Sequence, residues 1–125
     1  MYVLEQAVPE ATAIPGIRHA TWAGAADGLS SLSLWRQSIA PGGATPPHSH
    51  PCDEVVLCQA GHGEVEIAGR RHAFGPRQTI VLPAGVPHQI FNTGDVDLET
   101  TAVFAATPVP VALPDGSALE LPWRS

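Results

Sequence analysis

Proline and glycine set the strongest limit on what this chain can fold into. Thirteen prolines and twelve glycines are spread along 125 residues. They leave no window in which apolar residues recur with the 3.6-residue period of an amphipathic helix. Short runs of aliphatic and β-branched residues lie between the turn signals, and such runs are typical of strands. The sequence therefore predicts an all-β protein, an antiparallel sandwich or barrel.

About seven strands are expected, and their ranges are 29–40, 54–59, a hairpin over 64–74, 78–82, 88–92 and 96–106. In the hairpin, apolar Val65 and Ile67 alternate with glutamates, and Gly69 supplies the turn. Residues 1–28 are less regular and are expected to form an N-terminal edge strand or arm, on this or a neighbouring subunit. The barrel core would span 29–106, and 107–125 would form an extended tail. Together they make a single domain over 1–125.

Composition and charge exclude several classes of protein. The chain is 44% hydrophobic and 14% charged, which argues against general disorder. The net charge of −6 argues against nucleic acid and anionic membrane as partners. No apolar run approaches the ~18 residues of a membrane span, and the first residues lack the pattern of a signal peptide. We expect a cytoplasmic protein whose two cysteines are free thiols.

The segment HSHPCDE, residues 48–54, concentrates side chains that bind metals. Because alternate residues of a strand face the same side, His48 and His50 point one way, and Glu54 keeps their parity if the loop does not bulge. Pro83 and Gly85 form a turn before another strand, whose first residue, His88, can lie opposite the first three. Imidazole and carboxylate groups are ligands that Zn, Fe, Mn and Ni share.

These residues resemble the two motifs of the cupin superfamily. The first motif is complete, and its members are Gly42, His48, His50, Glu54 and Gly61. The second is matched by Pro83, Gly85, His88 and Asn92, whereas Arg77 stands where the family has its opening glycine. The motifs lie in 42–61 and 77–92. Fifteen residues separate Gly61 from Arg77, a spacing that resembles a short bacterial cupin.

The resemblance implies a jelly-roll β-barrel, the double-stranded β-helix of cupins, with one divalent transition metal (Fe, Mn, Ni or Zn) on His48, His50, Glu54 and His88. Strand parity adds the pocket-lining candidates Cys52, Val56, Cys58, Ile90 and Asn92. Gln37, in the strand before the first motif, is a further candidate as a polar contact. Asn92 is equally compatible with a turn-forming role, and Cys58 with a buried hydrophobic one. His19, His62 and His72 lack ligand spacing and are interpreted as surface residues.

The resemblance also implies a range of activities. The leading hypothesis is a metal-dependent enzyme with dioxygenase-like chemistry on a small oxygen-rich or aromatic metabolite, in which Glu54 could serve as a catalytic base. Two alternatives stay open: a non-catalytic metal-containing binder or sensor, and a zinc or nickel isomerase, lyase or polyketide cyclase. Ligands would be small molecules, and exposed sheet edges together with the apolar terminal segments predict a homodimer.

Overall fold

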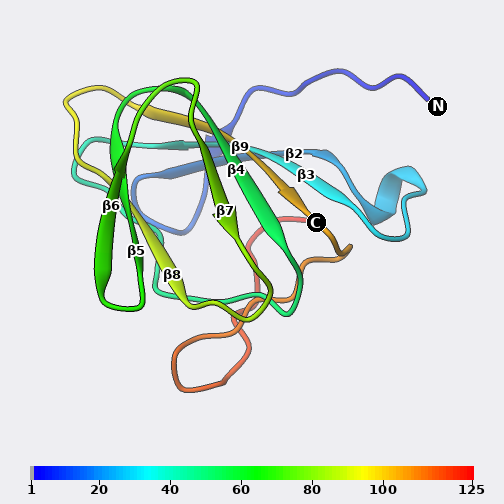
Figure 1. Ribbon diagram of the computed structural model, residues 1–125. Helices are drawn as coiled ribbons and strands as arrows, with labels where there is room; N and C mark the ends of the chain where they lie inside the picture. The colour runs from blue at the N-terminus through cyan, green and yellow to red at the C-terminus, as the bar shows by residue number, and fades with distance from the viewer. Residues whose placement is uncertain (1) are drawn as a thin grey trace.

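The computed structural model describes residues 2–125, and two antiparallel sheets account for its regular structure (Figure 1). The larger sheet has the order β1-β2-β3-β9-β4-β7, and its strands are β1 (Glu10–Ala11), β2 (Ile17–Ala23), β3 (Ser33–Ile39), β9 (Leu98–Phe104), β4 (Glu54–Ala60) and β7 (Thr79–Leu82). The smaller sheet has the order β6-β5-β8, and its strands are β6 (Arg70–Phe74), β5 (Gly63–Ile67) and β8 (His88–Asn92). One short 3₁₀ helix, η1 (Ala25–Asp27), follows β2. The all-β prediction is confirmed.

The N-terminal region contributes more to the barrel than its sequence suggested. Strand β2 pairs along its length with β3, from Ile17 opposite Ile39 to Ala23 opposite Leu34, with an irregularity between Thr21 and Ala23. Its first residue, Ile17, is buried in the core. Regular structure thus begins before residue 29, and residues 2–9 alone form an extended arm (Figure 1).

The β5–β6 hairpin forms where the sequence predicted it. Ile67 pairs with Arg70, so the loop contains only Ala68 and Gly69, and both have positive φ (52° and 76°). Two successive left-handed residues are what a type I′ turn requires, and such a turn matches the twist of the strands that it joins. Glycine meets this requirement without strain.

The core lies between the two sheets and is built by alternation along the strands. In β9 every second side chain is buried, and these are Leu98, Thr100, Ala102 and Phe104. In β4 the same alternation buries Glu54, Val56 and Cys58. Burying each large aliphatic or aromatic side chain stabilises the fold by about 1.5–3 kcal/mol. Because Glu54 lies in the buried row of β4, the strand that contributes to the core also presents a carboxylate to the interior.

The C-terminal tail folds back against the barrel. Val109 and Val111 are buried, and Leu119, Leu121 and Trp123 pack against the core cluster. Hydrogen bonds fasten the end of the tail: the Thr107 hydroxyl donates to the Ser125 carbonyl, and the Val109 N–H donates to the Ser125 hydroxyl. Nothing helical in residues 2–125 is long and apolar enough to cross a membrane.

Candidate metal centre

Three histidines from two separate segments meet inside the barrel. His48 and His88 form an isolated antiparallel bridge, in which each backbone N–H donates to the other's carbonyl (3.0 and 2.8 Å). His50 follows two residues after His48 and therefore faces the same way. The ligand nitrogens of the three imidazoles all lie within 4.8 Å of one another. The bridge thus brings together histidines that are forty residues apart in the sequence.

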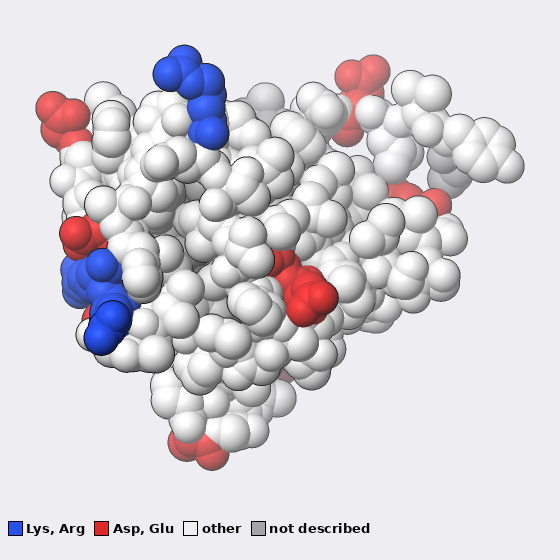
Figure 2. Space-filling model, viewed as in Figure 1, with Lys and Arg blue, Asp and Glu red and all other residues white. Residues whose placement is uncertain are grey.

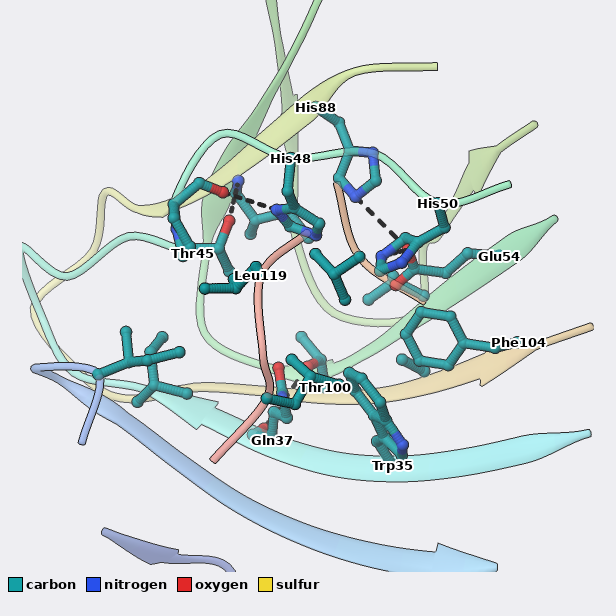
Figure 3. Close-up of a pocket in the computed structure, with 18 of the residues that line it drawn as sticks. Trp35, Gln37, Thr45, His48, His50, Glu54, His88, Thr100, Phe104 and Leu119 are labelled. Carbon is teal, nitrogen blue, oxygen red and sulfur yellow. Dashed lines mark hydrogen bonds and ion pairs between the residues drawn. The ribbon is translucent and has the colours of Figure 1, made fainter. Parts of the chain in front are cut away.

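Glu54 completes the cluster from the start of β4. Its Oε1 lies 3.4 Å from His50 Nε2 and 3.4 Å from His88 Nε2. His50, Glu54 and His88 are 4%, 6% and 4% exposed. Figure 3 shows the four side chains converging at one end of a cavity.

Backbone carbonyls orient all three imidazole rings. Nδ1 of His48 and Nδ1 of His88 each donate to the carbonyl oxygen two residues back, at 2.6 and 2.9 Å. Nδ1 of His50 donates to the carbonyl oxygen of Pro110 on the tail, at 2.8 Å. A carbonyl can only accept, so the proton of each neutral ring is on Nδ1 and each Nε2 presents a lone pair. Fixing the tautomer in this way is the usual outer-shell support of a metal-binding histidine.

A divalent metal fits this donor set. His50 Nε2, Glu54 Oε1 and His88 Nε2 are buried and have no hydrogen-bond partner in the described chain. The two 3.4 Å separations between Glu54 Oε1 and the ring nitrogens are not hydrogen bonds when the nitrogen and the oxygen both carry only lone pairs. Buried polar atoms without partners are rare in native proteins, and a shared cation satisfies all three at once. Three imidazoles and one carboxylate leave positions open on an octahedral ion, as a catalytic site requires.

The ionisation of the cluster suits metal binding. Burial, together with the neighbouring His88, lowers the pKa of His48 to about 4. Burial raises the pKa of Glu54, but hydrogen bonds and charge from His50 and His88, when these rings carry a proton on Nε2, hold it below its usual value. Near neutral pH the ring of His48 is therefore uncharged and Glu54 is ionised, which are the forms that coordinate a cation.

The cavity beside the cluster has mostly apolar walls. Its lining includes the predicted pocket residues Gln37, Val56 and Ile90, and the four candidate ligands. The remaining lining residues come from the N-terminal region, β3, β9, the loop before His48 and the tail, and they are Ile14, Ile17, Trp35, Ile39, Thr45, Pro46, Thr100, Ala102, Phe104, Val111, Leu119, Leu121 and Trp123. The inward rows of β3 and β9 could have identified Trp35, Thr100, Ala102 and Phe104 from sequence. The apolar residues of the tail were expected to pack in extended form, but no sequence pattern placed them at the cavity.

Comparison with known proteins identifies the family. Residues 35–104, more than half of the chain, match the family described as "Cupin domain". The chain belongs to the cupin family. Its two sheets are accordingly the cupin jelly roll, and the predicted fold class is confirmed.

Proteins similar to this chain in sequence include auxin-binding and germin-like proteins of plants. Auxin-binding protein 1 of Arabidopsis thaliana is 32% identical over 107 residues, which are 78% of this chain and 54% of that protein. Germin-like protein 3-8 of Oryza sativa subsp. japonica is 36% identical over 85 residues, which are 62% of this chain and 38% of that protein. This chain therefore spans about half or less of these relatives' length. A bacterial origin stays a prediction.

Solved cupin structures share the fold at low sequence identity. An oxalate oxidase structure superposes with a TM-score of 0.74 at 24% identity, covering 86% of this chain and 60% of that chain. The polyketide cyclase RemF from Streptomyces resistomycificus superposes with a TM-score of 0.73 at 22% identity, covering 87% and 83%. At such identities the likeness concerns the fold alone.

Three other candidate residues of this cupin lie away from the cavity lining of the described chain. Asn92 is buried, its Nδ2 donates to the carbonyls of Ile39 and Val96 (both 2.8 Å), and its Oδ1 accepts from the Gly94 N–H, so it stabilises a turn. Cys58 is 3% exposed and its thiol faces backbone carbonyls at the far end of β4. Cys52 is half-buried in the bend before β4.

The prediction that His19 lies on the surface is wrong. This residue faces inward from β2, is 7% exposed, and stacks on Trp123 with ring centroids 4.0 Å apart. It was misjudged because its cover comes from the tail, a hundred residues away in the sequence. His62 and His72 are exposed, as expected.

Proposed function

We propose that this cupin is a metal-dependent enzyme that acts on a small molecule, with oxygenase-type chemistry. One observation carries the proposal: beyond the four candidate ligands, the lining residues in the described chain include no acid, base, lysine, tyrosine or cysteine. Isomerases, lyases and cyclases need a positioned group that moves a proton, and here the one carboxylate, Glu54, is itself a candidate metal ligand. A redox-active metal with open positions would itself supply the reaction of an oxygen-rich substrate with O₂.

Substrate binding follows from the shape and polarity of the cavity. The candidate ligands gather at one end (Figure 3), and the lining includes apolar side chains such as Val56, Ile90 and Phe104. A compact, partly hydrophobic molecule fits such a site if one end carries a carboxylate or an adjacent pair of oxygens that reaches the metal. Polyphosphates do not fit, since the lining includes no lysine or arginine.

Glu54 has a second role in this proposal. It is the one carboxylate among the described lining residues, so a proton released by the substrate within the cavity would pass to Glu54 Oε1. Burial raises the pKa of this carboxyl, but the neighbouring His50 and His88 hold it below its usual value, so Glu54 is ionised and able to accept a proton. At saturating metal, Glu54→Gln, which retains the side chain's size, should reduce turnover more than it reduces substrate affinity.

A non-catalytic binder is the second candidate. The same scarcity of reactive groups favours it, and several curated relatives at about 30% identity are named for binding auxin. Metal analysis of protein purified without chelator or metal-affinity resin is the first test. Iron would support the oxygenase proposal, whereas zinc or nickel would favour the binder or a non-redox enzyme.

A thermal-shift panel then tests the ligand class. Metal-loaded protein should be stabilised by small carboxylates, catechols and diketones, with auxin included, and not by nucleotides or sugar phosphates. Oxygen uptake with each stabilising compound separates the enzyme from the binder. Stabilisation by nucleotides alone would contradict both the pocket and the function proposed for it.

We also propose that the protein is a homodimer. The arm exposes Tyr2, Val3 and Val8 (104%, 92% and 81%), and the outer face of the β4–β7 edge exposes Leu57 and Val81 (38% and 65%). The face in Figure 2 carries few charged side chains. Apolar residues beside an unpaired sheet edge favour association with a second copy. Light scattering at micromolar concentration should give twice the chain mass of 13.1 kDa, and a monomer mass would refute the idea.

A further inference from the structure

A second group of polar side chains, in which His19 is buried and Gln37 and Thr21 are partly buried, begins on the cavity wall away from the metal ligands. Gln37 lines the cavity, and its Nε2 lies 2.9 Å from His19 Nδ1 (Figure 3 shows Gln37 across the cavity from the histidine cluster). The other ring nitrogen, His19 Nε2, lies 2.7 Å from Thr21 Oγ1. Thr21 Oγ1 in turn donates to the carbonyl oxygen of Arg124 on the tail. Neither His19 nor Thr21 belongs to the candidate metal centre.

The Arg124 carbonyl, the last acceptor in this series of hydrogen bonds, fixes the direction of the others. A carbonyl oxygen can only accept, so Thr21 Oγ1 uses its single proton to donate to Arg124. Thr21 Oγ1 must then accept from His19, which places a proton on His19 Nε2. The tautomer of His19 is therefore set by a backbone oxygen of the tail.

His19 is also uncharged. Burial, together with the nearby Arg124 guanidinium, lowers its pKa to about 3. A neutral ring with its proton on Nε2 has an unprotonated Nδ1, which accepts a hydrogen bond. Gln37 must therefore turn its NH₂ group toward His19, as the 2.9 Å contact requires. Gln37 Oε1 then points away from His19 and has no hydrogen-bond partner in the part of the chain that the structure describes.

We propose that Gln37 Oε1 is a fixed hydrogen-bond acceptor in the cavity, and that it selects ligands bearing an O–H or N–H group remote from their metal-binding oxygens. His19 and Thr21 act as positioning residues that prevent the amide from reversing. This specificity rests on the proposed function, because it requires a ligand held at the metal. A site built to accept a hydrogen bond disfavours an analogue without the donor, since the acceptor is then left unpaired.

The tautomer can be measured without metal or ligand. Long-range ¹H–¹⁵N NMR of metal-free protein distinguishes protonation at Nε2 from protonation at Nδ1. We expect His19 to show the Nε2–H form at pH 5 to 8. Thr21→Val, which keeps the side chain's shape but removes the acceptor, should let the Nδ1–H form appear. The matched control is Thr79→Val on the exposed outer face of β7, which should leave the spectrum of His19 unchanged. An Nδ1–H tautomer in the unaltered protein would show that the hydrogen-bond directions assigned to Thr21, His19 and Gln37 are wrong.

Ligand selection is measured by calorimetry on Zn²⁺-loaded protein. The probes are benzoate, 3- and 4-hydroxybenzoate and the two corresponding methoxybenzoates, which differ in a single donor. We expect one hydroxybenzoate to bind about two- to tenfold more tightly than benzoate and its methoxy partner, the range typical of one uncharged hydrogen bond. Gln37→Leu should bring that ratio to about one with little change for benzoate, and Thr21→Val should reduce it.

Two failures can be told apart. If Zn²⁺-loaded protein binds the probes but shows no preference that depends on Gln37, the acceptor role is wrong and the proposed function stands. If no probe binds, the proposed function fails, and the selectivity assigned to Gln37 falls with it. The NMR result on His19 is valid in either case because it needs no metal.

Discussion

The dependence of stability on the metal can be worked out from the cluster itself. Three buried polar atoms in it lack hydrogen-bond partners, and each such group costs about 1–3 kcal/mol unless something satisfies it. A metal that binds only the folded chain removes this cost and adds about 2.7 kcal/mol of stability at a hundredfold excess over Kd. Unfolding a chain of 125 residues has an entropy of roughly 0.26 kcal/mol/K, so the metal should raise Tm by about 10 °C.

His50→Ala tests this reasoning most directly. The substitution removes one ligand, its hydrogen bond to the Pro110 carbonyl and a ring that packs against Phe104, so most of the metal should be lost. The metal-induced rise in Tm, measured by calorimetry with and without chelator, should fall to a few degrees. His72→Ala, at an exposed position on β6, is the control and should keep the full rise. If His50→Ala retains full metal content and the full rise, the assignment of the ligands is wrong.

Three further predictions concern acid stability, packing and the carboxylate ligand. The depressed pKa of His19 means that its contribution to stability is full above pH 6.5 and is lost as pH falls toward 3. Between pH 7 and 4 the free energy of unfolding of the metal-free protein should therefore fall by about 2 kcal/mol more than that of His19→Gln, after allowance for solvent screening. Urea titrations across this pH range measure the difference. If the free energy of unfolding falls equally with pH in the two proteins, the prediction is wrong. Gly63→Ala should destabilise the fold by about 2 kcal/mol or more, because a Cβ would lie 2.5 Å from a backbone oxygen and 2.7 Å from an aromatic carbon, whereas Gly94→Ala, with its nearest atom at 3.6 Å, should be mild. Glu54→Gln should weaken metal binding by at least about tenfold in competition titrations, while Glu66→Gln on the exposed hairpin should not.

Local sequence rules indicated the ligand cluster, and the resemblance to the cupin motifs implied its full set of four residues. The alternation of a strand placed His48 and His50 on one side, and the Pro83–Gly85 turn placed His88 at the start of the next strand. Both rules act over a few residues, and the cluster forms because the barrel then pairs His48 with His88. The strand ranges were predictable for the same reason, since turn residues separate them.

The tail and the surroundings of His19 could not be predicted in this way. Trp123 stacks on His19, and Arg124 accepts from Thr21, across about a hundred residues of sequence. Nothing near His19 in the sequence indicates that another segment will cover it. Its burial is a property of the tertiary fold, and so is the hydrogen-bond direction that depends on the tail.

Strand parity gives the side of the sheet but not the depth within the barrel. Asn92 and Ile90 lie on the same inward row of β8, yet Ile90 lines the cavity and Asn92 stabilises a turn beyond it. Cys58 and Val56 differ in the same way on β4. The cavity therefore occupies the end of the barrel where the histidines enter, and the inward residues farther along the strands close the other end. The depth of a side chain within the barrel follows from its distance from the start of its strand. Glu54 and His88 are the first residues of β4 and β8, and this position places the metal centre beside the cavity.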